Sequence, residues 1–396
     1  MDLTYGAEYE PFRSEVREFI EKNRDKTPGS PGRGTPAEAA RAWQQLLIEH
    51  GYAARTIPKE YGGYGAEPDI LKTRIIAEEF ARARVQPGHS GDFRLVPTLL
   101  ELGTEEQKKK WIAPTIRGEI SWCQGYSEPE AGSDLASLRT SAVVDGDEFV
   151  INGQKIWTSG AKTAEMIFCL VRTEPDAPKH QGISYLLFSM DTPGIEVRPL
   201  VTMTGDATFN EVFFTDVRVP TDQIVGARGD GWFVANATLK HERGGLGDPD
   251  AAENRFRAVV EMMKTETIDG RCLMDHPTYR DRLLKLQARM LSMKFNGMRN
   301  FSHQLRGEDP GMSRWIVKLQ GCELNHQVAS LAIDIMGESG ILYRGSPYLR
   351  DRGMWQSNYM MDLGLIIGGG TAQIQKNIIG ERALGLPKEP KQELKI

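Results

Sequence analysis

The sequence predicts an α+β protein in which two helical regions enclose a middle region of short strands. Between residues 9 and 118 apolar side chains recur at helix spacing, for example at Phe12, Val16 and Phe19. Helical periodicity returns at residue 231 and continues to about residue 384. The chain has 396 residues, more than one hydrophobic core usually supports, so we expect two or three domains.

The middle region is recognised by short runs of β-branched and aromatic residues bounded by Gly, Pro, Asp or Asn. This spacing predicts a compact β-barrel or sandwich. In the first helical region, residues 27–36 are rich in Pro and Gly and predict an exposed loop, and Thr104 with Gln107 predicts a capping box. The predicted strands lie at residues 148–153, 166–171, 183–188, 194–197 and 212–214.

The composition is that of an ordinary globular protein with a formal net charge of −5, which argues against a nucleic-acid partner. The four cysteines are far apart and lack histidines at metal-ligand spacing, so we expect reduced thiols and no metal site. No apolar run reaches the roughly 20 residues that span a bilayer. The first residues also lack a basic segment followed by an apolar one, so we expect a cytoplasmic protein with no membrane partner.

Several long motifs occur in an order that resembles the acyl-CoA dehydrogenase family, a group of FAD-dependent flavoenzymes. Two of them are Tyr-Ser-Glu-Pro-Glu-Ala-Gly-Ser-Asp at 126–134 and Gly-Gly-Gly-Thr-Ala-Gln-Ile-Gln at 368–375. The others lie at residues 57–63, 152–159 and 211–220, so the resemblance covers nearly the whole chain.

The resemblance implies the acyl-CoA dehydrogenase fold. Its domains would be an N-terminal helical domain at 1–118, a middle β-barrel at 119–228 and a C-terminal four-helix bundle at 229–396. It further implies FAD as cofactor, an acyl-CoA substrate, an electron-transfer flavoprotein as electron acceptor, and a tetramer.

In the family, the segment matching residues 124–133 runs along the flavin and the start of the CoA, and that matching 157–159 covers the ring near N5. Ser127 and Ser159 can donate hydrogen bonds to the ring, and Gly132 permits close backbone approach. Trp157 can pack on the ring, and the alternative is that it belongs to the core of the barrel. The resemblance implies flavin contacts at Gln124, Tyr126, Ser127, Gly132, Ser133, Trp157, Thr158, Ser159, Thr371 and Gln373, and substrate contacts at Ser133 and Arg243.

The catalytic base is the main departure from the family pattern. Many members have a glutamate directly before the Gly-Thr of the C-terminal motif, but this chain has Gly369 there, and glycine cannot accept a proton. A subset places its glutamate on a helix directly before an arginine, which Glu242 and Arg243 match. Glu242 is therefore our candidate base, the alternatives being a surface ion pair and a chain without catalysis. The N–H of Gly369 still suits the thioester oxygen, together with a ribityl hydroxyl.

Two family segments that bind the flavin pyrophosphate and adenine across a subunit boundary are not intact. Their regions here are 269–277 and 334–340, where Asp334 and Glu338 would place like charges next to a pyrophosphate. The chain thus resembles the glutamate-bearing subunit of the unlike-subunit α2β2 acyl-CoA dehydrogenases of bacterial sterol side-chain degradation. A homotetramer with divergent contacts stays open.

Together these residues predict α,β-dehydrogenation of an acyl-CoA thioester to the trans-2-enoyl-CoA. The Gly244-Gly245 pair after the candidate base favours a branched, long or polycyclic acyl group. Two alternatives remain: an oxidase or monooxygenase on the same fold, and a non-catalytic partner subunit.

Overall fold

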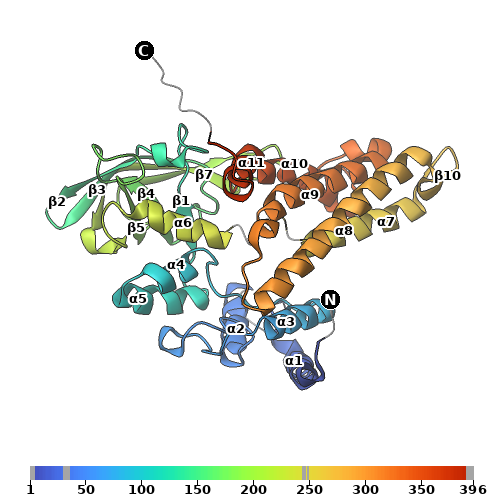
Figure 1. Cartoon of the computed structure of the whole chain (residues 1–396), viewed down its shortest axis with the longest axis horizontal. Coiled ribbons are helices and arrows are strands. Elements are labelled where there is room, and N and C mark those ends of the chain that lie inside the picture. Colours follow the sequence, from blue (N-terminus) through green and yellow to red (C-terminus); the bar gives the residue numbers. More distant parts are fainter. Residues whose placement is uncertain (1–4, 30–35, 243–246, 248, 389–396) are drawn as a thin grey trace, which may run out of the picture. The chain divides into compact units, whose positions relative to one another are not determined.

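The computed structural model describes residues 5–29, 36–242, 247 and 249–388. The chain divides into two compact units. The first contains residues 1–200 and 207–241, and the second contains residues 201–206 and 242–396. Figure 1 labels the elements of both units.

The N-terminal part of the first unit is helical, as predicted. Its helices bury an apolar stripe that includes Val16, Phe80 and Leu99. The predicted capping box is present, because Thr104 Oγ1 accepts from the Gln107 N–H and Gln107 Oε1 accepts from the Thr104 N–H. Residues 30–35 of the predicted loop lie outside the described residues. The helices are α1 (Glu10–Lys22), α2 (Pro36–Glu49), α3 (Ile70–Ala83), α4 (Leu95–Leu102) and α5 (Glu105–Ile116).

The five predicted strands (β3, β4, β5, β6 and β7) form the sheet of the same unit together with β1, β2 and β8, which were not predicted. The strand order is β6-β7-β3-β2-β4-β5-β8, with β1 parallel to β4. The two strands β4 and β5 are buried along nearly their whole length, which explains their continuous apolar sequences. Helix α6 (Gly231–Glu242) follows and contributes Val234 and Ala235 to the core of this unit. The strands are β1 (Trp122–Gly125), β2 (Ser141–Asp145), β3 (Glu148–Lys155), β4 (Met166–Arg172), β5 (Ile183–Ser189), β6 (Ile195–Leu200), β7 (Phe209–Pro220) and β8 (Ile224–Val225).

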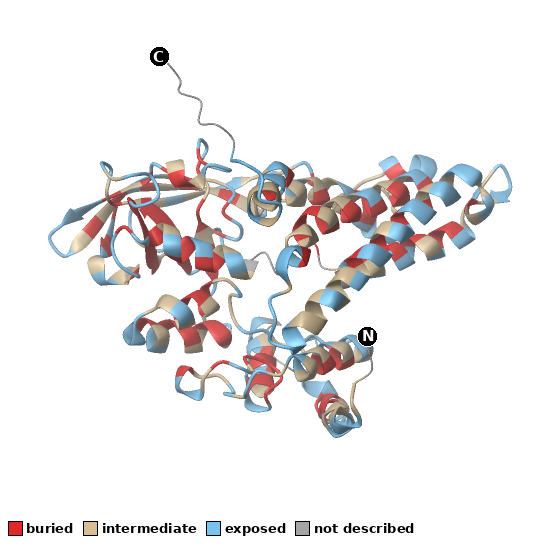
Figure 2. Cartoon of the chain, viewed as in Figure 1, coloured by how far each residue is buried: buried red, intermediate tan, exposed pale blue. Residues whose placement is uncertain are grey.

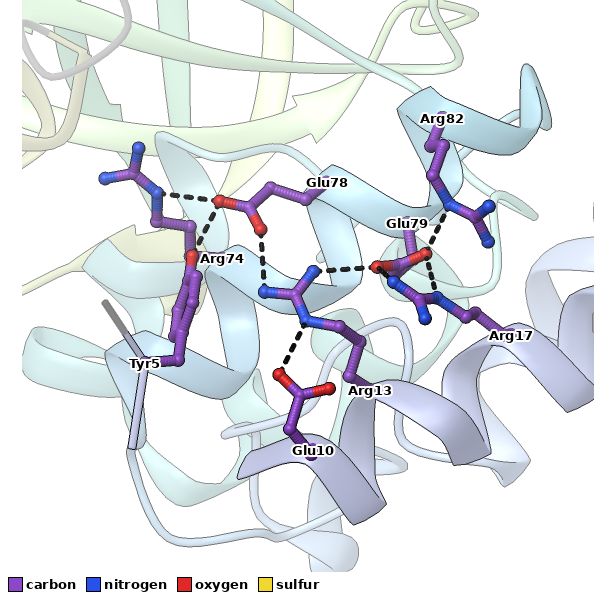
Figure 3. Close-up of polar contacts among 8 residues, drawn as sticks. All are labelled: Tyr5, Glu10, Arg13, Arg17, Arg74, Glu78, Glu79 and Arg82. Atoms are coloured by element: carbon purple, nitrogen blue, oxygen red, sulfur yellow. Dashed lines mark hydrogen bonds and ion pairs between the residues drawn. The ribbon is translucent and has the colours of Figure 1, made fainter. Parts of the chain in front are cut away.

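Helices α1 and α3 are joined by a cluster of charged side chains (Figure 3). The Glu79 carboxylate on α3 is only 2% exposed and accepts hydrogen bonds from Arg13 and Arg17 of α1 and from Arg82 of its own helix. Burial alone would raise the pKa of Glu79, but the three guanidinium groups lower it to about 2. The carboxylate therefore stays charged and links the two helices.

The second unit is a helical bundle with its own core. Helix α9 packs against α7, α8 and α10, and its buried residues include Leu324, Val328 and Leu331 at helix spacing (Figure 2). No helix within the described ranges is both long and apolar enough to cross a membrane. The elements of this unit are α7 (Pro249–Thr265), β9 (Thr267–Ile268), β10 (Arg271–Cys272), α8 (Pro277–Leu305), α9 (Ile316–Ile335), α10 (Met354–Ile367) and α11 (Ala372–Ile378).

Candidate flavin and substrate site

The two segments expected to contact the flavin lie side by side in the first unit. The N–H of Ile156 donates to the carbonyl oxygen of Ser127 at 2.9 Å, so the chain after β1 runs next to the chain after β3. Tyr126 is buried beneath this contact and anchors the first segment in the core. Other candidate residues are at least partly accessible to a ligand: Gln124, Ser127, Gly132, Ser133, Trp157 and Ser159.

A buried ion pair fastens these two segments together. Lys155, at the end of β3, is fully buried, and its Nζ lies 2.8 Å from Glu128 Oε1 and 3.2 Å from the carbonyl oxygen of Tyr126. The Glu128 carboxylate also accepts from the N–H groups of Arg139 and Thr140, at 2.6 and 2.9 Å. Burial opposes the charge on Glu128, but Lys155 and these donors lower the pKa of the carboxyl below its ordinary value.

Trp157 follows directly in a backbone conformation that non-glycine residues rarely adopt, with a φ of 60°. The chain is fixed on both sides of it, by the Ile156 hydrogen bond and by the bonds between the Thr158 and Asn210 backbones at 3.0 and 3.1 Å. Trp157 is 56% exposed, and its ring packs edge-to-face with Phe209, 5.8 Å away between ring centroids. The alternative that Trp157 belongs to the barrel core is therefore wrong.

Two further polar groups in this region suit a flavin. Thr158 is fully buried, and its Oγ1 finds no hydrogen-bond partner in the described part of the chain, so a ligand atom would satisfy it. Gln124 is oriented by Arg94, whose Nη1 donates to Gln124 Oε1 at 3.0 Å. Arg94 itself lies over the Phe168 ring and pairs with Asp92 at 2.7 Å. These residues fit a bound isoalloxazine ring.

The candidate base lies at the last residue of α6. Thr238, one turn earlier on the same helix face, is fully buried, and its Oγ1 is 3.0 Å from Thr98 Oγ1 of α4. This contact fixes the helix close to Glu242. The Glu242 side chain, Arg243 and the pair Gly244-Gly245 lie outside the described residues.

The glycine turn between α10 and α11 belongs to the second unit. Gly369 and Gly370 have φ values of 65° and 91°, in the left-handed region where a side chain would be strained. Thr371 caps α11, since its Oγ1 accepts from the Ile374 N–H at 3.2 Å. Gln373 is exposed.

Gly247, five residues after Glu242, lies against helix α9. A Cβ at Gly247 would lie 2.6 Å from the carbonyl oxygen of Val317, and one at Gly321 would lie 2.3 Å from that of Gly247, so the two backbones touch. Glu242 is five residues before Gly247, and five residues span at most about 18 Å. This tether limits how far the candidate base can be from α9.

The negative charge that Asp334 and Glu338 were expected to place near a pyrophosphate is partly neutralised. Arg282 Nη2 lies 2.6 Å from Asp334 Oδ2, so one of the two acids has a partner in its own chain. Glu338 is exposed. Residues 267–272 form the hairpin β9-β10, with Asp269 and Gly270 in its turn.

The sequence patterns did not identify the residues that hold the candidate segments in place. Lys318 stands between Val317 and Leu319 on α9, and a lysine at a position that periodicity assigns to a core is the signal that was available for it. Lys155 follows the polar residues Asn152 and Gln154 and had no such signal. Arg94 and Thr238 have no comparable signal in the sequence.

Three family models match consecutive parts of the chain. They are the acyl-CoA dehydrogenase N-terminal domain at residues 6–119, the middle domain at 123–217 and the C-terminal domain at 229–384. The chain belongs to the acyl-CoA dehydrogenase family. It is an FAD-dependent enzyme of this family with the predicted fold.

Similar proteins include acyl-CoA dehydrogenases of mycobacteria and two solved complexes. The acyl-CoA dehydrogenase IpdE1 of Mycobacterium tuberculosis is 39% identical over 96% of this chain and 99% of its own length. The Tcur3481-Tcur3483 steroid acyl-CoA dehydrogenase has a TM-score of 0.79 at 31% identity, covering 98% of this dehydrogenase and 100% of that chain. The ChsE4-ChsE5 complex from Mycobacterium tuberculosis gives a TM-score of 0.79 at 33% identity with the same coverage.

Proposed function

We propose that this dehydrogenase removes the α-proton and the β-hydride of an acyl-CoA thioester, with Glu242 as the base, and forms the trans-2-enoyl-CoA. Bound FAD would supply the hydride acceptor at N5. The Glu242 carboxylate takes the proton from Cα, and the negative charge that develops on the thioester oxygen is stabilised by the Gly369 N–H. Electrons then pass to an electron-transfer flavoprotein.

The observation that carries this proposal is the contact of Gly247, five residues after Glu242, with helix α9. It keeps Glu242 within about 18 Å of a helix that also contacts the glycine turn. The left-handed backbone at Gly369 is a second support, because a glutamate there would be strained in that conformation. A base on α6 avoids that strain.

Replacing Glu242 by glutamine tests the base. The amide has the same shape but cannot accept the proton, so kcat should fall by at least about 10³-fold while the flavin spectrum and flavin content stay unchanged. Glu261→Gln is the matched control, since Glu261 is an exposed residue of α7 whose carboxylate pairs with Lys264. More than a tenth of the wild-type kcat in the Glu242 variant would exclude this residue as the base.

We further propose a bulky acyl group, of the kind derived from a steroid side chain. Support comes from the pair of glycines after Glu242 and from a similar complex described as a steroid acyl-CoA dehydrogenase. Turnover of butyryl-CoA that exceeds turnover of a steroid-derived acyl-CoA would contradict this substrate class. Hydrogen peroxide formed in step with the substrate consumed would instead indicate an oxidase.

A further inference from the structure

Helix α9 carries a lysine buried in the helical bundle. Lys318 is 3% exposed and lies in the sequence between the apolar residues Val317 and Leu319. Its Nζ donates to the carbonyl oxygen of Gly370 at 2.6 Å and to that of Ile366 at 3.0 Å. Among the residues that the structure describes, no carboxylate lies within ion-pair distance of it.

Burying an ammonium group without a carboxylate is unfavourable, and an apolar side chain would fill the same space at lower cost. The electrostatic compensation here comes from the backbone. Ile366 is in the last turn of α10, so the lysine lies at the negative end of that helix. The side chain thus stabilises one arrangement of the residues that follow α10.

A second buried side chain fixes the same turn. Gln375 of α11 is 4% exposed, and its Nε2 donates to the carbonyl oxygen of Gly369 at 3.3 Å. Lys318 and Gln375 therefore bind successive carbonyl groups of the turn. The N–H of Gly369 finds no hydrogen-bond partner in the described part of the chain, and the residue is partly exposed. The carbonyl oxygens of Gly369 and Gly370 are thus held by hydrogen bonds, whereas the Gly369 N–H is left available to a ligand.

We propose that Lys318, with Gln375, is a positioning residue that orients the Gly369 N–H toward the thioester oxygen. The inference rests on the proposed function. Consecutive glycines adopt many conformations, and a hydrogen-bond donor stabilises a developing charge efficiently only when it is oriented beforehand. Lys318 supplies that orientation from outside the flexible turn.

Acetoacetyl-CoA tests the orientation of the Gly369 N–H without turnover. Its enolate carries a negative charge on the thioester oxygen, as the reacting substrate does, and it absorbs in the ultraviolet. The flavin-loaded protein is titrated with this probe, together with its partner chain if flavin binding requires one. In Lys318→Met the enolate fraction of the bound probe at a fixed pH should fall at least tenfold relative to wild type. With a steroid-derived acyl-CoA that the wild-type protein oxidises, kcat should fall by about 10²-fold while KM changes less than threefold.

Lys294→Met is the matched control, because Lys294 is a lysine of α8 that pairs with Glu253 and does not contact the turn. If Lys318→Met does not fold, Gln375→Met decides the question, with an expected fall in the enolate fraction of at least threefold. Enolate fractions equal to wild type in the variants that fold would overturn the role of Lys318. A wild-type protein that neither enolises the probe nor oxidises any acyl-CoA would instead overturn the proposed function.

Discussion

Two buried lysines hold candidate segments in place, one in each of the two units. Lys155 fixes the segments that carry Tyr126, Ser127 and Trp157, and Lys318 fixes the turn that carries Gly369. The two lysines differ in what compensates their charge. For Lys155 it is the Glu128 carboxylate, and for Lys318 it is the partial negative charge of backbone carbonyl oxygens. At the residue scale, each of these candidate segments is therefore fixed by hydrogen bonds from a buried lysine.

Replacing only one member of the Glu128–Lys155 pair should be strongly destabilising. Glu128→Gln leaves a buried ammonium without its counter-charge, which costs about 3 kcal/mol or more. In a unit of this size that corresponds to a fall in Tm of about 6–12 °C, measurable by differential scanning fluorimetry. Flavin content should fall with it, since the strained backbone at Trp157 loses its support.

The double variant Glu128→Leu/Lys155→Met distinguishes the effect of an unpaired buried charge from the effect of losing the hydrogen bond between Lys155 and Tyr126. Removing both charges should recover most of the lost Tm, because no buried ion is left unpaired. Flavin affinity should stay weakened, since the hydrogen bond from Lys155 to the Tyr126 carbonyl is also gone. Single variants with the wild-type Tm would contradict this account.

At the scale of the elements, α1 and α3 are joined by ion pairs to Glu78 and Glu79, and Glu79 is the more buried of the two acids. Glu79 is surrounded by guanidinium groups from both helices (Figure 3). By contrast, Glu21 of α1 is 70% exposed and pairs with Arg24 of the next turn. Exposed pairs of the second kind contribute little to stability. Glu21 therefore serves as the control when the contribution of Glu79 to stability is measured.

The stability of the first unit should depend on pH through Glu79. Its pKa in the folded chain is about 2, below its ordinary value of 4.5, so its contribution is complete above about pH 5 and is lost as the pH falls toward 2. This contribution is at most about 3 kcal/mol. Glu79→Gln should lower Tm at pH 7 by several degrees and by much less at pH 3, as followed by thermal melts across that range. Glu21→Gln should change Tm little at either pH, and an equal loss in both variants would argue against the role of Glu79.

At the scale of the whole molecule, the open question is how many chains build one flavin site. The segments that suit the flavin ring are present, while Asp334 and Glu338 occupy the region where the family resemblance places the pyrophosphate. Helix α8 also exposes Leu284, Leu291 and Phe295 at 52%, 37% and 57%, spaced by seven and four residues along one helix face. We propose from these observations an α2β2 assembly with a second acyl-CoA dehydrogenase-like chain.

The flavin-to-chain ratio tests this assembly. Purified alone, the protein should contain much less than one FAD per chain, because half of the site is missing. Purified with a second acyl-CoA dehydrogenase-like chain encoded beside it, the complex should contain one FAD for every two chains. Absorbance at the flavin and protein bands, with mass from light scattering, gives both numbers. A fully flavinylated homotetramer would favour divergent contacts within a single kind of chain.

The sequence by itself determined the order of helices, strands and helices, the family and the cofactor, because periodicity and long motifs are local properties of the chain. It also located Trp157, Gly369 and Glu242 as candidates, but it left the alternative that Trp157 is part of the core. Only the tertiary structure decided that alternative, and only it revealed the contacts Lys155–Glu128 and Lys318–Gly370, which join residues 27 and 52 positions apart. Burial and long-range hydrogen bonds depend on which segments meet in space, and no local pattern specifies that.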